Sequence, residues 1–299
     1  MPSSSSSSNS AGTPADVNGL RVFVPNSNLA GFLQIHPGST KFDCTAAIVS
    51  LALDILESKS SVIALKTFTR EVVTLNQDVR ELRDLPEFHI ELKANEFLGS
   101  VRRSFPHIVI TNANGMRTKN GRTTKRDCLG TFEPKSAAVI ELNETLVDRM
   151  ANANCVLVTR DSDAHAQHYH TLLFRLAITV AHELVHIYNL FLRRRGVNHT
   201  PPPRTYGGYR DQNAGESGRY WEYLVFGGFI DMRDTSSNPH NNMEAVAIRD
   251  SHRNVWRIKN VVIEGILSRD FGRWLKPGEP INDPEHPKNT FTQILTPYH

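Results

Sequence analysis

The segment LLFRLAITVAHELVHIYNLFL, residues 172–192, constrains the fold of this chain more than any other stretch. It is nearly long and apolar enough for a membrane span, but polar residues interrupt it: Arg175, His182, Glu183, His186 and Asn189. Each of these side chains would be costly to place in lipid. The segment therefore predicts a helix buried in a protein core, which the rest of the chain must surround.

Most of the polar residues of this helix form one stripe. Arg175, Thr179, His182, His186 and Asn189 follow one another at spacings of four, three, four and three residues. This spacing places their side chains on one helix face. A face directed to bulk water would be expected to carry Lys and Glu instead, so we expect the stripe to face a cleft.

Within the stripe, His182 and His186 lie one helical turn apart. Their imidazoles project from the same face and can reach one metal ion, at about 2.0–2.1 Å from each nitrogen. Glu183 is close enough to contact a water on that ion without being a ligand. This is the HExxH arrangement, in which the metal lowers the pKa of the water and the glutamate takes its proton. The pattern resembles the active-site helix of zincin metallopeptidases; the alternative is an ordinary core helix with hydrogen-bonded imidazoles.

A catalytic zinc site of this kind needs a third protein ligand and one open position. The metzincin pattern requires a histidine six residues after the second motif histidine, and this chain has Leu192 there. That class is therefore excluded. The zincins with an aspartate ligand are similar only loosely, through Tyr206, Gly207, Gly208 and Asp211.

A glutamate on a following helix, as in gluzincins, is the remaining choice, and GESGRYWEY supplies Glu216 and Glu222. Glu216 precedes Ser217 and Gly218, whose small size lets the second helix approach the first. Bulky aromatic residues flank Glu222 and would hold its backbone further away. We therefore predict Glu216 as the third ligand, with Glu222 as the alternative. Arg219 and Glu222 would then hold a ligand histidine or pair with Glu216, unless they form only an ion pair on the helix surface.

The motifs AHELVH and GESGRYWE, within residues 181–224, are together similar to the gluzincin-like signature of a group of uncharacterised intracellular fungal proteins. The resemblance implies a metallopeptidase with zinc as its cofactor. Such an enzyme also needs a donor that stabilises negative charge on the substrate oxygen. The loop between the two helices offers Tyr206, Tyr209 and His199 for this role, and loop packing is the alternative role of the tyrosines.

Composition adds a few limits. The sequence has 34 Lys+Arg against 31 Asp+Glu, and a net charge of +3 gives no general reason to expect nucleic acid or an anionic membrane as a partner. Three cysteines are too few and too widely spaced for a disulfide framework or a CxxC metal site. The serine-rich residues 1–20 predict a disordered tail and lack the pattern of a secretory signal, so we expect an intracellular, cytoplasmic protein.

Shorter patterns predict the elements around the helix. Apolar or alternating runs predict strands near 20–24, 88–92, 107–111 and 137–143. Helical spacing predicts a helix over 45–58. The residues ELN at 141–143 resemble the edge strand that zincins place before the active-site helix, where an extended peptide can add as a further strand.

The basic segment RTKNGRTTKR, residues 117–126, contains no hydrophobic residue. It predicts a surface loop or hairpin tip. A flap that binds acidic substrates, through Lys119, Arg122 and Lys125, is the alternative.

We therefore predict an α+β, zincin-like fold, with a small mixed sheet packed on a buried active-site helix and a mostly helical C-terminal lobe. Residues 21–299 are expected to form one catalytic domain, with lobes at about 21–196 and 197–299. The predicted function is zinc-dependent hydrolysis of a peptide or amide bond in a peptide or protein. Glu183 would activate water and later protonate the leaving amine. An enzyme that acts on a small molecule and a zinc-binding module without turnover are the alternatives.

Overall fold

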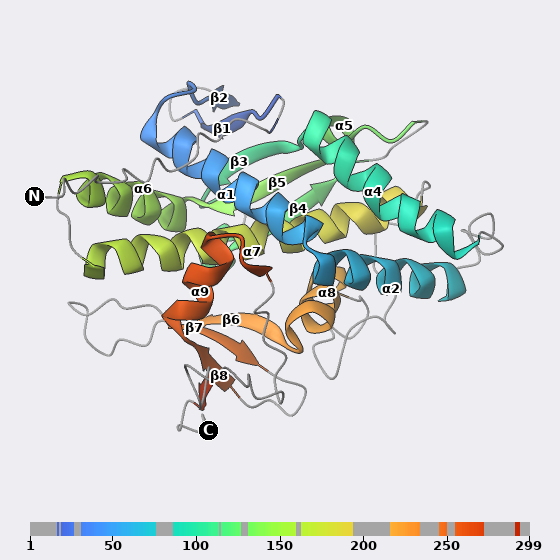
Figure 1. The fold of residues 1–299 in the computed structure, drawn as a ribbon. Coiled ribbons are helices and arrows are strands. Elements are labelled where there is room, and N and C mark those ends of the chain that lie inside the picture. The colour runs from blue at the N-terminus through green and yellow to red at the C-terminus, as the bar shows by residue number, and fades with distance from the viewer. Residues whose placement is uncertain are drawn as a thin grey trace, which may run out of the picture.

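The computed structural model describes residues 17, 19–26, 31–75, 86–113, 115–126, 131–159, 163–193, 216–233, 245–249, 255–271 and 291–293. This part of the chain contains helices and two β-sheets (Figure 1). The helices are α1 (Thr40–Glu57), α2 (Lys59–Leu75), α4 (Glu87–Arg103), η2 (Met116–Thr118), α5 (Pro134–Ala137), α6 (Glu144–Thr159), α7 (Asp163–Arg193), α8 (Ser217–Phe226) and α9 (Asn260–Leu267). The strands are β1 (Val22–Pro25), β2 (Phe32–Gln34), β3 (His107–Thr111), β4 (Gly121–Lys125), β5 (Ala138–Asn143), β6 (Phe229–Arg233), β7 (Ala245–Arg249), β8 (Val255–Ile258) and β9 (Phe291–Gln293).

The first sheet has the strand order β2-β1-β3-β5-β4 and is mixed, as predicted. Strands β1, β3 and β5 are parallel, whereas β2 and β4 are antiparallel to their neighbours and form the two edges. In the pairing of β4 with β5, Gly121 lies opposite Leu142 and Lys125 opposite Ala138. The strands predicted near 20–24, 107–111 and 137–143 correspond to β1, β3 and β5.

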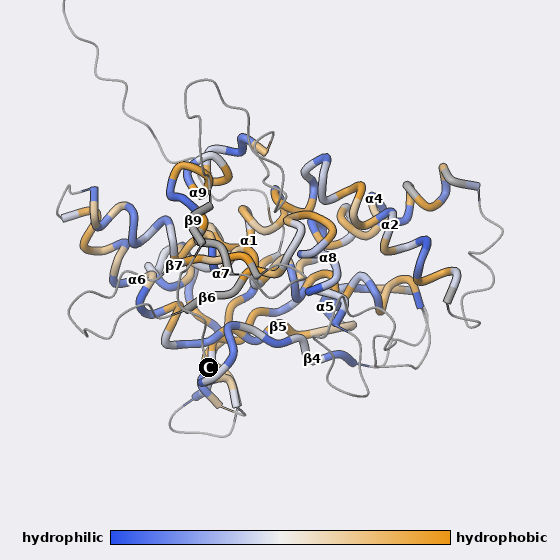
Figure 2. The backbone as a smooth tube through the Cα atoms, turned by 90° about the horizontal axis from the view of Figure 1, so that it is seen from below, coloured by the Kyte–Doolittle hydropathy of each residue, from blue (hydrophilic) through white to orange (hydrophobic). Residues whose placement is uncertain are grey.

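Helix α7 runs through the middle of the fold and contacts α1, α6, α8, α9 and β4. Figure 2 shows the hydrophobic residues of α1 and α7 gathered in the centre of the molecule. Among the described residues, α7 is the helix long and apolar enough to cross a membrane, yet most of its residues are buried inside the fold. The prediction of a buried core helix is therefore confirmed. Helix α1, which begins after its N-cap Ser39, covers one side of α7.

Two sequence predictions near this sheet are wrong. Residues 88–92 lie in helix α4, not in a strand, because Ala94, Phe97, Leu98 and Val101 continue a helical spacing and are buried. The residues ELN at 141–143 belong to β5, which has a neighbour on both sides and is not an edge strand.

The basic segment 117–126 is also not a loop throughout, because Gly121–Lys125 form the edge strand β4. Its residues alternate between two faces. Thr123 donates a hydrogen bond to the Glu183 carbonyl oxygen of α7 at 3.1 Å, and Arg122 pairs with Glu141 of β5 on the opposite face. Contacts with α7 and β5, rather than hydrophobic side chains, therefore hold this strand in place.

The described C-terminal residues contain strands as well as helices. Strands β6, β7, β8 and β9 form an antiparallel sheet in that order, and α9 packs on α7. In Figure 1 this second sheet lies on the other side of α7 from the first sheet. The described part of the predicted C-terminal lobe therefore includes a β-sheet, which the sequence analysis did not predict. The predicted disordered tail, residues 1–20, lies mainly outside the described residues.

Candidate active site

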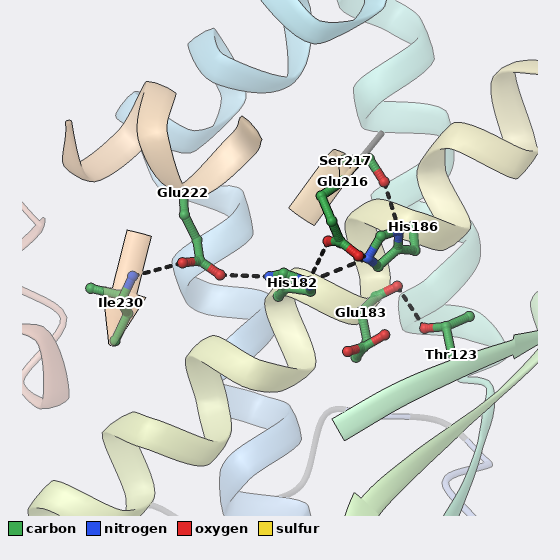
Figure 3. Close-up of polar contacts among 8 residues, drawn as sticks. All are labelled: Thr123, His182, Glu183, His186, Glu216, Ser217, Glu222 and Ile230. Carbon is green, nitrogen blue, oxygen red and sulfur yellow. Dashed lines mark hydrogen bonds and ion pairs between the residues drawn. The ribbon is translucent and has the colours of Figure 1, made fainter. Parts of the chain in front are cut away.

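Three side chains, two from helix α7 and one from the N-cap of helix α8, converge on one point in the structure (Figure 3). His182 and His186 lie one turn apart on α7, and Glu216 is the residue immediately before α8. The two Nε2 atoms are 3.3 Å apart, and Glu216 Oε2 is 3.2 Å from each of them. Among the described residues, this is the one group of His, Cys, Asp or Glu side chains with the spacing of a metal site.

The triangle of donor atoms has the dimensions of a tetrahedral metal site. Three tetrahedral ligand atoms that are 3.2–3.3 Å apart surround a centre about 2.0 Å from each of them. This is the length of zinc–nitrogen and zinc–oxygen bonds in proteins. Three protein donors would leave the fourth tetrahedral position of such a metal for water or substrate, as in catalytic sites.

The other ring nitrogen of each histidine is held by an oxygen atom. His182 Nδ1 lies 2.6 Å from Glu222 Oε1, and His186 Nδ1 lies 2.7 Å from Ser217 Oγ. A carboxylate only accepts hydrogen bonds, so the neutral His182 ring carries its proton on Nδ1 and keeps the Nε2 lone pair for the metal. The other oxygen of Glu222 accepts a bond from Ile230 N at 2.7 Å. These contacts fix both imidazoles with their Nε2 atoms directed at the shared point.

Ionisation in the metal-free site follows from the same contacts. Burial alone would lower the pKa of His182, but hydrogen bonds with Glu216 and Glu222 outweigh burial and raise its pKa well above 6.5. Burial would raise the pKa of Glu216, but hydrogen bonds with His182 and His186 hold it far below its ordinary value. A positive charge among these groups is therefore stabilised, and a metal cation would take the place of the proton.

Helix α8 reaches this position because a glycine faces the histidine. A Cβ atom added at Gly218 would lie 2.3 Å from His182 Cδ2, so a larger residue does not fit. The helix is anchored further along by Trp221, which is fully buried and donates from Nε1 to Ser61 Oγ at 2.8 Å. It ends at Gly227, whose φ of 73° is the left-handed conformation that glycine adopts easily.

Glu183 lies on the side of α7 that faces β4 rather than α8. The residue is 6% exposed, and its backbone carbonyl accepts the hydrogen bond from Thr123 (Figure 3). A Cβ atom added at Gly121 would lie 3.5 Å from Glu183 Cγ, so β4 passes directly beside this side chain. Glu183 is not one of the three converging ligands. Glu183 follows His182 directly in the chain, and the edge strand β4 holds it beside the three converging side chains.

A cation at the end of β4 also belongs to these surroundings. Burial lowers the pKa of Lys125, while the charges of Glu216 and Glu183 act in the opposite direction. Arg193, at the end of α7, adds to the lowering. Lys125 therefore lies within electrostatic range of both a predicted ligand and the predicted base.

The other residues predicted for the site are not part of the triangle of donor atoms. Glu222, the alternative third ligand, lies behind His182 and is 6% exposed, whereas Glu216 is 35% exposed. Arg219 stacks over the Phe229 ring, with Cζ 5.5 Å from its centroid. Tyr206, Tyr209, His199 and Asp211 lie outside the described residues.

The sequence analysis did not predict where Ser217 and Lys125 lie relative to the site. Ser217 was expected only to permit close packing, but its hydroxyl also holds His186. The sequence contained a signal for this contact. Ser217 offers a hydroxyl group directly after the predicted ligand Glu216, at the start of the second helix. Lys125 was assigned to a surface loop, or alternatively to a flap that binds acidic substrates, although Gly121, Thr123 and Lys125 occupy alternate positions, as residues on one strand face do.

Two histidines one helical turn apart, a carboxylate from a second helix and a glutamate beside them are the components of a metal-dependent hydrolase, and of metallopeptidases in particular. Residues 65–227, more than half of the chain, match the family described as metallopeptidase toxin 3, and the chain belongs to this family. The matched span contains His182, Glu183, His186 and Glu216. The metallopeptidase class predicted from the sequence is thereby confirmed. The comparisons with curated proteins and with solved structures gave no match.

Membership of this family indicates a metal-dependent peptidase. It implies a metal ion as the cofactor and a peptide or protein as the substrate. The group formed by His182, His186 and Glu216 fits this requirement, because all three offer lone pairs to a common point.

Proposed function

We propose that this chain is a zinc-dependent peptidase with a gluzincin-like, and in its fold zincin-like, active site. The observation that supports this proposal best is the triangle of donor atoms from His182, His186 and Glu216, with sides of 3.2–3.3 Å. Nitrogen and carboxylate donors with one open position suit zinc. A zinc ion there would polarise the carbonyl group of the substrate and lower the pKa of water.

Glu183 is the general base of the proposed mechanism. It accepts a proton from the attacking water and then donates it to the nitrogen of the leaving amine. Its position supports this role, because the bond from Thr123 to its carbonyl and the contact with Gly121 fix the backbone and the start of the side chain. Glu222 and Ser217 hold the two imidazoles in the required orientation throughout.

The edge strand β4 is the proposed platform for the substrate. Among the described strands, β4 pairs with β5 alone, and it runs beside Glu183. An extended peptide that pairs with its other edge would lie along the predicted base and the metal site. This role was expected for residues 141–143, but those residues lie inside the sheet, and β4 takes their place.

Metal content is the first test of this function. The purified full-length protein is expected to contain close to one zinc ion per chain by elemental analysis. His186→Ala and Glu216→Ala should lose the metal, because each removes a donor atom. Glu222→Ala should keep it, because Glu222 contacts the metal site only through His182. A wild-type protein that cannot be loaded with zinc would contradict the proposal.

Cleavage of a peptide library is the second test. Glu183→Gln removes the base but keeps the size of the side chain, so cleavage should fall roughly 10²–10⁴-fold while zinc remains bound. Equal cleavage by wild type and Glu183→Gln would refute the proposed role of Glu183. A zinc-loaded wild type that cleaves no peptide would instead favour a small-molecule substrate or a binding module.

A further inference from the structure

Lys125 faces α7, as the alternation of β4 requires. Successive side chains of a strand point to opposite faces. Gly121 and Thr123 both contact α7, and Lys125 is the next residue on that face. Its register opposite Ala138, a buried residue of β5, is consistent with this direction.

Lys125 differs from the other cations of the same segment. Arg122 points to the opposite face of the sheet, where it pairs with Glu141. Arg117 and Lys119 are exposed and precede the strand, and Arg126 is exposed and follows it. Lys125 is partly buried and interacts electrostatically with Glu183 and Glu216. It is therefore the cation of this segment that lies on the α7 side of β4 and whose charge is coupled to the predicted base and to a predicted ligand.

The charges around Lys125 favour an anion once a metal is present. A divalent cation with Lys125 and Arg193 would bring four positive charges against the three carboxylates of Glu183, Glu216 and Glu222. Lys125 lies two residues after Thr123, which is a distance of about 7 Å along β4. Because Thr123 marks the position of Glu183, Lys125 lies beside a neighbouring residue of an extended substrate rather than beside the bond to be cleaved.

We propose that Lys125 forms an anion-binding subsite next to the metal centre and binds a carboxylate group of the substrate. The carboxylate belongs either to an acidic side chain or to the C-terminus of a peptide. This inference rests on the proposed peptidase function and adds a substrate preference to it. Lys125 is then a specificity residue, and its ammonium group donates a charge-assisted hydrogen bond to the substrate.

Matched hydroxamic acids test this inference without a known substrate, because the hydroxamate group binds zinc. The first pair carries glutamate or glutamine next to the hydroxamate. The second pair consists of succinyl hydroxamates of one dipeptide that ends in a free carboxylate or in an amide. Calorimetry measures the binding of all four to the zinc-loaded, full-length protein. The proteins compared are wild type, Lys125→Gln, Lys125→Arg and the control Lys119→Gln, each with its zinc content measured.

In one pair, the carboxylate compound is expected to bind wild type roughly 10- to 100-fold more tightly than its amide. The pair that shows this preference identifies the source of the carboxylate. Lys125→Gln should lose the preference with little change for the amide, whereas Lys119→Gln and Lys125→Arg should keep it.

Other results overturn the inference. Equal binding within both pairs by the wild type contradicts it alone, since the metal site is then intact. An equal weakening of all compounds in Lys125→Gln also contradicts it and assigns Lys125 to support of the metal site. Failure of all four compounds to bind the wild type contradicts the proposed zinc-dependent active site, and this inference with it.

Discussion

Gly218 of α8 lies against the ring of His182 with no room for a side chain. A Cβ atom at this position would be 2.3 Å from Cδ2, 2.4 Å from Cγ and 2.5 Å from Nε2 of the ring. The ring cannot move aside freely, because Glu222 holds Nδ1 at 2.6 Å and is itself bound to the backbone of Ile230. Glycine at 218 is therefore the condition under which α8 delivers Glu216 to the histidines.

This packing predicts that Gly218→Ala weakens metal binding. The added methyl group must push α8 or the ring away, so zinc affinity is expected to fall by roughly tenfold or more in competition with a chelator. Gly99→Ala in α4 is the matched control, because its Cβ would meet only Arg103 Nη1, at 3.4 Å. The control should keep its zinc affinity and gain up to about 1 kcal/mol of stability. Full zinc affinity in Gly218→Ala would show that α8 shifts without cost.

Glu222→Gln is expected to weaken the metal site without abolishing it. Glutamine keeps the size of the side chain and an oxygen for Ile230 N, but it loses the negative charge beside His182. Partners of this kind typically contribute 10- to 100-fold to metal affinity, so a decrease in that range is expected in the chelator assay. Glu96→Gln, which changes an exposed carboxylate of α4, is the control. A complete loss of zinc, as expected for Glu216→Ala, would instead make Glu222 a ligand.

The sequence predicted the helical half of the site better than the strand half. The positions of His182, His186 and Glu183 follow from the fixed geometry of a helix, and the small residues after Glu216 indicated a close approach of helices. Strand β4 gave no such signal, because its partners come from α7 and from Glu141, both distant in the sequence. Its residues supply contacts rather than a hydrophobic pattern, and a pattern of hydrophobic residues is what strand prediction requires.

The error at α4 has a different cause. Phe88–Leu92 alternates apolar and polar residues as a strand does, but the burial of Ala94, Phe97 and Val101 depends on α1, α2 and α7. Packing against other helices overrode the local pattern. Similarly, the bond from Ser217 to His186 depends on how two helices meet, which the sequence does not specify.

The shifted pKa values around His182 predict the pH dependence of the metal-free protein. A raised histidine pKa stabilises the folded state fully below its unfolded value of 6.5, and this stabilisation is lost as pH rises through the folded pKa. A lowered carboxyl pKa, as for Glu216, stabilises the folded state above 4.5 and is lost as pH falls. The difference in unfolding free energy between wild type and His182→Gln should therefore be largest between about pH 4.5 and 6.5.

Bound zinc should reverse the loss of stability that the metal-free protein shows as the pH rises above 6.5. Bound zinc must displace the His182 proton, so the stabilisation that zinc adds grows as pH rises. Urea denaturation of wild type and His182→Gln from pH 4 to 9, with and without zinc, measures both effects. A difference between the two proteins that does not change with pH would contradict the assigned charges.

Gly121 and Thr179 provide the last prediction, which concerns the base rather than the ligands. A Cβ atom at Gly121 would lie 2.6 Å from Thr179 Cγ2 and 3.3 Å from the Glu141 carbonyl oxygen. Gly121→Ala should therefore push β4 away from α7 and displace Glu183. A shift of about 1 Å can cost a hundredfold in rate, so peptidase activity is expected to fall on that order. Zinc content should stay near the wild-type level, since β4 supplies none of the three ligands.

The same contact suggests a rescue. Thr179→Ser removes Cγ2 but keeps the hydroxyl that donates to the Arg175 carbonyl oxygen at 3.0 Å, so by itself it should be close to wild type in activity. Combined with Gly121→Ala, it makes room for the new methyl group and should restore most of the lost rate. Activity and zinc content of the two single variants and the double variant test this. If the double variant is no more active than Gly121→Ala, contact with Thr179 is not what sets the distance between β4 and Glu183.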